Sequence, residues 1–131
     1  MHINLESDYA VRIVRTLAQS GERTDAQAIA DKSCVSLRIT LKIMRKLVAA
    51  DLVRSYKGAR GGYELTRDPA DITLRQVIEA IEGPYRFSRC LDSGYDCTCK
   101  ETIACPFHSV FDDVTAMVVK RLDEITFDQL L

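Results

Sequence analysis

Apolar residues recur at helical spacing through most of the chain, and the pattern predicts a mainly α-helical protein. Four helices are expected in the first two thirds of the sequence, at about 8–19, 25–32, 37–48 and 74–82. A polar residue able to cap the helix stands just before each of them: Ser7, Thr24, Ser36 and Thr73. Thr24 with Gln27 and Thr73 with Gln76 also have the spacing of a capping box.

The period of the pattern changes to that of strands after Asp51. Residues 52–56 and 62–66 read as two strands, joined by the glycine-rich basic loop 57–61. The two preceding helices are joined by a short turn near Cys34, and the second of them is basic. A hairpin with a cationic tip after such a helix pair predicts a winged helix-turn-helix with a two-stranded wing.

A long helix is predicted from Pro106, a residue well suited to the first helical position. Its apolar stripe runs from Phe107 to Ile125 and is too extensive for a lone peripheral helix in a chain of 131 residues. We therefore expect it to pack against a second copy in a homodimer. The expected organisation is a DNA-binding domain at 1–84, a cysteine loop at 85–108, and a dimerisation helix with a final capped turn at 106–131.

Positive charge is concentrated in one segment. Residues 36–67 carry eight Lys and Arg against two acids, a net charge of +6, whereas the remainder carries −7. This asymmetry favours a polyanion-binding face, although a solvated helix surface is the commoner role of a charge run. Expected base-edge contacts are Ser36, Arg38, Ile39 and Lys42, and expected phosphate contacts are Lys46, Arg54, Lys57 and Arg60.

Four of the five cysteines lie close together in the sequence and are followed by a histidine: Cys90, Cys97, Cys99, Cys105 and His108. One disulfide would not use so many thiols, and thiolates with an imidazole are ligands of zinc and of iron–sulfur clusters. Spacing alone does not separate these two metal sites. The fifth cysteine, Cys34, is expected to be a small buried residue.

The remaining patterns narrow the class of protein. The sequence contains no Ser/His/Asp set, phosphate loop or paired-carboxylate motif, so an enzyme is not expected. It also lacks a run of eighteen apolar residues and a signal-peptide layout, which predicts a cytoplasmic protein without a membrane partner.

The wing and the cysteine loop together resemble the iron–sulfur-sensing winged-helix repressors of the IscR, NsrR and RirA type. The resemblance covers nearly the full chain and rests on these segments: Asp8-Tyr9-Ala10, Ser36-Leu37, Leu47 to Val53, Lys57 to Tyr63, and Ser88-Arg89-Cys90. It implies a homodimer that binds operator DNA and holds a cluster with three loop cysteines and a fourth ligand.

In the IscR-like branch the resemblance gives the fourth ligand to a histidine three residues after the last cysteine, which is His108 here. The family's five-residue gap then selects Cys99 with Cys105, and Cys90 comes first, after a longer gap than in IscR. Cys97 is surplus and is an alternate for Cys99. A 2Fe-2S cluster on this set is preferred; a 4Fe-4S cluster using Asp8 of a partner subunit, as in the NsrR-like branch, is the second choice.

The sequence therefore predicts a DNA-binding transcriptional regulator, a repressor, whose operator affinity depends on a bound iron–sulfur cluster. Two alternatives stay open. One is a winged-helix protein with a structural zinc site, and the other is a thiol-based redox sensor without a cluster that reacts through Cys97 and Cys99.

Overall fold

The computed structural model describes residues 1–100 and 105–131 and confirms the predicted fold class. Its helices and strands are α1 (Leu5–Ser20), α2 (Ala26–Ser33), α3 (Leu37–Ala49), β1 (Val53–Tyr56), β2 (Gly62–Leu65), α4 (Leu74–Glu82) and α5 (Pro106–Glu124). Short 3-10 turns occur at Pro69–Asp71, Arg89–Leu91 and Phe127–Leu130. The described part of the chain is thus mainly helical, with one antiparallel hairpin.

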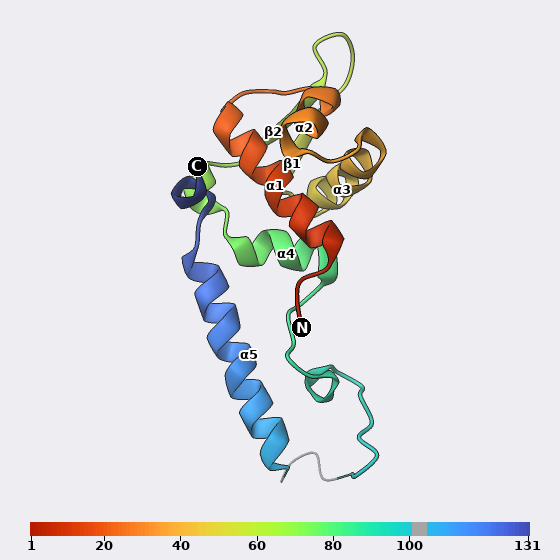
Figure 1. The fold of residues 1–131 in the computed structure, drawn as a ribbon, viewed down its shortest axis with the longest axis vertical. Coiled ribbons are helices and arrows are strands. Elements are labelled where there is room, and N and C mark those ends of the chain that lie inside the picture. The colour runs from red at the N-terminus through yellow and green to blue at the C-terminus, as the bar shows by residue number, and fades with distance from the viewer. Residues whose placement is uncertain (101–104) are drawn as a thin grey trace.

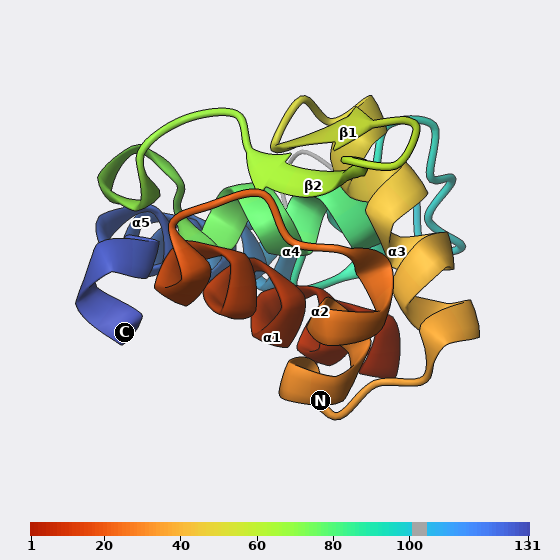
Figure 2. The same ribbon diagram turned by 90° about the horizontal axis from the view of Figure 1, so that it is seen from above.

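The first three helices and the hairpin form the predicted winged helix-turn-helix. Ser36 caps α3 as expected, since its side chain accepts a hydrogen bond from the backbone N–H of Ile39. The chain then enters β1, whose Val53 pairs with Leu65 of β2 and whose Tyr56 pairs with Gly62. The hairpin lies beside α3, and the connection between the strands projects away from the domain (Figures 1 and 2). The wing is therefore next to the helix that is expected to contact DNA.

A single apolar core holds this domain together, and α1 lies at its centre. The inward face of α1 is fully or almost fully buried at Ala10, Ile13, Val14 and Leu17. The other helices and the hairpin supply the rest of the cluster: Ile29, Ile43, Met44, Leu47, Leu52, Val53, Ile72 and Val77. Burial of these side chains fixes α3 against α1, so the position of one helix depends on the other.

The end of the chain returns to this core after α5. Phe127 is completely buried within the cluster. Its backbone N–H donates to the carbonyl of Ile72, and the N–H of Leu74 donates to the carbonyl of Ile125. Figure 1 shows α5 running along one side and reaching beyond the domain, with its C-terminal end beside α4. One end of α5 is thus anchored to the domain, while its first turns extend from it.

The helix α5 begins at Pro106 as predicted, but little of it is buried by its own chain. Thr115 is its one buried residue in the described structure, whereas Phe107, Val110 and Met117 are more than half exposed. In the residues that the structure describes, we find no helix long and apolar enough to cross a membrane.

Two predicted caps are wrong. The first helix begins earlier than expected and is capped by Asn4, because Ser7 is buried and its hydroxyl donates to the carboxylate of Glu82. The second helix is capped by Asp25, because the backbone of Thr24 is paired with Tyr63 of the wing. The capping box of Thr73 and Gln76 on α4 is confirmed.

The prediction that Cys34 is buried is also wrong. Cys34 ends α2 with a backbone φ of 56° and has an exposed side chain. The left-handed conformation reverses the chain there, and the next residue, Val35, takes the inward position with 6% exposure.

We expect Phe127→Ala to lower the free energy of unfolding by about 3–5 kcal/mol, because it leaves a cavity in the common core. Urea denaturation followed by circular dichroism measures this loss. Leu131→Ala, at a residue that is 55% exposed, is the matched control and should change the value by less than about 0.5 kcal/mol. Equal losses in the two variants would show that the final turn is not part of the core.

Candidate metal-binding loop and DNA-binding surface

The segment after α4 carries the predicted metal ligands and buries little apolar surface. Among residues 85–100, none is fully buried. Its beginning is held by a few contacts: the N–H of Tyr85 donates to the carboxylate of Glu79, the N–H of Phe87 donates to the hydroxyl of Thr115, and the Phe87 ring packs on Phe111 with centroids 5.2 Å apart. These contacts set the loop alongside the first half of α5.

All five predicted donors in this region line one cavity of about 620 Å³: Cys90, Cys97, Cys99, Cys105 and His108. Cys90 belongs to the 3-10 turn Arg89–Leu91, and His108 lies in the first turn of α5. Aromatic side chains of Tyr95, Phe107 and Phe111 form much of the remaining wall. The fold therefore brings the predicted ligands, from a loop and from the start of a helix, to one cavity.

The donors present fit a thiophilic metal or a cluster. The Nδ1 atom of His108 is buried and has no hydrogen-bond partner among the described residues, an arrangement that costs free energy unless something binds there. Cys105 precedes α5 without capping it, so its thiol is not engaged by the helix. Within residues 1–100 and 105–131, however, no three His, Cys, Asp or Glu side chains converge on one point. The side chains share a cavity without closing around an ion.

The structure places Asp8 away from this cavity. Asp8 lies in the first turn of α1 and forms an ion pair with Arg12 at 2.5 Å. It does not belong to the residues that line the cysteine cavity. Its predicted role as a ligand therefore requires the Asp8 of a second copy.

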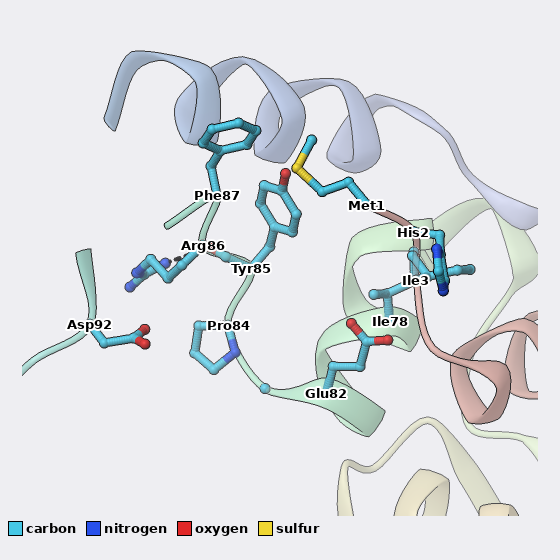
Figure 3. Close-up of a pocket in the computed structure, with 11 residues that line it drawn as sticks. Met1, His2, Ile3, Ile78, Glu82, Pro84, Tyr85, Arg86, Phe87 and Asp92 are labelled. Atoms are coloured by element: carbon cyan, nitrogen blue, oxygen red, sulfur yellow. Dashed lines mark hydrogen bonds between the residues drawn. The ribbon is translucent and has the colours of Figure 1, made fainter. Parts of the chain in front are cut away.

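A second cavity, of about 560 Å³, lies where the cysteine segment meets the DNA-binding domain. Figure 3 shows its walls, which come from the N-terminal residues Met1 to Ile3, from Ile78 and Glu82 of α4, and from the segment after Pro84. The carboxylate of Glu82 accepts hydrogen bonds from the N–H of Asn4 at 2.5 Å and from the hydroxyl of Ser7 at 2.9 Å. The start of α1 is thus tied to the last residue of α4, which two residues separate from the cysteine segment.

The outer face of α3 forms the predicted DNA-binding surface. A groove of about 750 Å³ is lined by Leu37, Arg38, Ile39, Leu41, Lys42 and Arg45. Three of the predicted base-edge contacts, Arg38, Ile39 and Lys42, lie in it, and Ser36 caps the same helix end. Arg45 was not among the predicted contacts, although its spacing from Arg38, Leu41 and Lys42 places it on the same face.

Two of the predicted DNA contacts are already paired within the chain. The ammonium groups of Lys42 and Lys46 each bind one oxygen of the Glu6 carboxylate, the second at 2.7 Å. The hydrogen bond from Lys42, followed by that from Lys46, lowers the pKa of Glu6 from 4.5 to about 2. The carboxylate therefore stays ionised near neutral pH, and the contribution of the pairing to stability is lost only as the pH falls below 4.5 towards about 2.

The wing carries the other predicted contacts and is braced by a residue that the sequence did not single out. Arg54, Lys57 and Arg60 are exposed. Arg23, just before α2, places its guanidinium 3.3 Å from the centroid of the Tyr56 ring and donates to the carbonyl of Arg60 at 3.0 Å. No short-range sequence pattern reveals this contact, because it joins residues 37 positions apart.

Comparison with known proteins places this arrangement among transcriptional regulators. The model of the family Rrf2, described as "Iron-dependent Transcriptional regulator", matches residues 3–131. The HTH-type transcriptional regulator NsrR of Bacillus subtilis is 25% identical over 133 residues, which cover 100% of this chain and 90% of NsrR. These relatives are regulators, in agreement with the prediction that the chain is not an enzyme.

Solved structures show the same fold. The IscR of T. potens superposes with a TM-score of 0.74 at 26% identity, over 99% of this chain and 85% of that chain. CymR, described as the global cysteine regulator of B. subtilis, superposes with a TM-score of 0.73 at 27% identity, over 99% of this chain and 95% of that chain. The fold is thus shared by regulators of the IscR type and by a regulator named for cysteine.

Substitution of Arg60 tests whether the wing contacts phosphate. We expect Arg60→Ala to weaken binding to duplex DNA and to reduce the slope of log K against log salt by about 0.9, the value for one lost phosphate contact. Lys120→Ala removes the same charge from α5 and should leave the slope unchanged. The measurement is fluorescence anisotropy across a salt series, and an unchanged slope in Arg60→Ala would remove Arg60 from the contact surface.

Proposed function

Because the chain belongs to the Rrf2 family of iron-dependent transcriptional regulators, we propose that its affinity for operator DNA is controlled by an iron–sulfur cluster bound in the cysteine loop. The observation that carries the proposal is the common cavity of four cysteines and His108, whose buried Nδ1 lacks a partner in the described structure. In this proposal the protein is a cytoplasmic repressor of transcription.

The proposed ligands are Cys90, Cys99, Cys105 and His108, with Cys97 as the alternate for Cys99. Three thiolates and one imidazole suit a 2Fe-2S cluster, and imidazole ligation raises its potential above that of an all-cysteine site. A 4Fe-4S cluster with the Asp8 of a second copy is the alternative. When bound, the cluster would supply a redox-active group. Its charge would depend on its oxidation state, and its occupancy would depend on the supply of iron and on exposure to oxidants.

The chain's own residues explain how ligation would reach the DNA-binding domain. Holding Cys90 and His108 in one site would fix the loop against the first turn of α5. The same segment leads back to Glu82, which binds Asn4 and Ser7 at the start of α1. A change in the loop would therefore act on α1, and through the core on α3. This is a proposed coupling between two sites.

On the DNA side, the groove of α3 would receive base edges through Arg38, Ile39 and Lys42, with Ser36 at the helix start. Lys46, Arg54, Lys57 and Arg60 would contact phosphates. A two-fold dimer would present two such surfaces to the half-sites of an operator.

The exposed face of α5 supports the proposed homodimer. Phe107 is 67% exposed, Val110 55% and Met117 71%, and all three lie on one side of the helix. Exposed apolar surface of this kind is typical of an interface. If the same face of a second copy packed against this one, the dimer would have a two-fold axis. The two cysteine loops and the two α3 helices would then be related by that axis.

A thiol-based sensor is the second candidate function. Cys99 and Cys34 are exposed free thiols, and the similar structure of CymR is that of a regulator named for cysteine. In this case Cys97 and Cys99 would react directly and no cluster would be present. A structural zinc site would use the same side chains and would stabilise the fold without signalling.

Metal analysis after anaerobic purification tests the cluster proposal. We expect iron with matching sulfide, visible absorption bands that bleach in air, and retention of both in Cys97→Ser. Cys99→Ser should lose most of the cluster, because a ligating thiolate is removed. Zinc without sulfide would support the structural site, and neither metal would support the thiol sensor; retention in Cys99→Ser with loss in Cys97→Ser would exchange their roles.

Sedimentation equilibrium tests the dimer. Met117→Glu places a charge in the proposed apolar interface and should weaken self-association at least about tenfold, since an unpaired buried charge is costly. Ala116→Glu is the matched control. Ala116 directly precedes Met117 and is exposed, but lies outside the apolar face of α5, so this variant should remain dimeric. A dimer of unchanged affinity in Met117→Glu would exclude this face as the interface.

A further inference from the structure

Glu6 is an acidic residue set among the basic residues of the DNA-binding surface. It lies in the first turn of α1, while its partners Lys42 and Lys46 are one turn apart on α3. Each carboxylate oxygen binds a different ammonium group, Oε1 that of Lys42 and Oε2 that of Lys46. Two neighbouring oxygens of a DNA phosphate could bind the same two groups, so Glu6 occupies the position of such a ligand.

The three side chains are accessible from solvent. The exposed fractions of the side chains are 59% for Lys42, 37% for Lys46 and 31% for Glu6. Lys42 lines the groove together with Arg38 and Arg45. An approaching phosphate would therefore meet lysines that already have a counter-charge, whereas Arg38 and Arg45 form no ion pair within the described residues.

The position of Glu6 is fixed by the fold. In this respect its pairing with the two lysines differs from an ion pair between two mobile surface side chains. Asn4 caps the same turn, and both Asn4 and Ser7 bind Glu82 of α4. Ser7 is fully buried and its hydroxyl donates to Glu82, so a movement of the first turn of α1 would break this hydrogen bond to α4. The carboxylate is thus presented to the lysines by a rigid helix end.

We propose that Glu6 is a specificity-determining residue of DNA binding. On DNA of random sequence, where Lys42 does not meet the base edge expected for it in an operator, Glu6 competes with phosphate for both Lys42 and Lys46. Sequence-independent binding depends on phosphate contacts, so it is weakened most by this competition. Operator binding adds contacts to base edges from other residues of α3 and keeps more of its affinity. Glu6 therefore increases the ratio of the affinity for operator DNA to the affinity for random DNA.

The proposal rests on DNA binding through α3 and does not depend on the cluster. Glu6→Gln keeps the shape of the side chain and removes its charge. Glu124→Gln is the matched control, because it removes the same charge from an exposed ion pair with Arg121 on α5, away from α3. Both are compared with the wild-type chain by anisotropy on a duplex of random sequence and on an operator obtained by selection from random duplexes.

In Glu6→Gln we expect affinity for random DNA to rise by about threefold to tenfold at low salt, with a smaller rise for the operator. The slope of log K against log salt should steepen by about one to two, because one or two lysine–phosphate contacts no longer have to displace a carboxylate. The control should show neither effect. Random-DNA affinity equal to that of the control, or lower than that of the wild type, would overturn the proposal.

Lys46→Ala in both backgrounds gives an independent measurement. If Glu6 masks this lysine, the loss of random-DNA affinity on Lys46→Ala is greater in Glu6→Gln than in the wild-type chain. Equal losses would contradict the competition even if the single variant changed affinity for another reason. Absence of the cluster would be detected by metal analysis and would leave this comparison intact.

Discussion

The cysteine segment lacks an apolar core of its own, and the proposed control of DNA binding depends on this property. Residues 85–100 contain no fully buried side chain, so apolar packing does not hold them in one arrangement. Their beginning is held by the hydrogen bond from Tyr85 to Glu79 and by the contacts of Phe87 with Thr115 and Phe111. A ligand that joined Cys90 in the loop to His108 on α5 would supply the missing restraint. A loop that took its arrangement from such a ligand would also respond to the loss of that ligand.

The DNA-binding domain has the opposite character, because it is built around a packed core. Leu47 of α3, Val14 of α1 and Phe127 from the end of the chain belong to one buried cluster. Such cores are densely packed, so under the proposed coupling a displacement at the start of α1 would act on α3. Glu82, the last residue of α4, binds the start of α1, and two residues separate it from the cysteine segment. Contacts thus join α4 to α1 and α1 to α3, and the loop follows α4 in the chain.

Local sequence signals predicted the elements well where one signal stood alone. Ser36, the Thr73 capping box and Pro106 each start the helix expected of them. The errors arose where two polar residues competed for the same helix end. Ser7 and Thr24 could both have capped, but distant partners, Glu82 and Tyr63, engage them instead. Cys34 was misplaced for a related reason: its left-handed backbone conformation depends on how α2 must turn into α3, which composition does not reveal.

The residues that line the candidate site were predictable from the sequence, but their surroundings were not. The closely spaced thiols and the histidine pointed to the residues that line this cavity. They are near one another in the sequence, so their proximity could be expected before the fold was known. The pairing of Glu6 with the α3 lysines spans 36 and 40 positions and needed the structure. The most direct test of the central claim is the affinity of one selected operator for the cluster-loaded and cluster-free protein, measured anaerobically at one salt concentration. We predict that the two affinities differ by at least about tenfold, which is about 1.4 kcal/mol of coupling between the cluster site and the DNA-binding surface. Equal affinities for the two forms would contradict it.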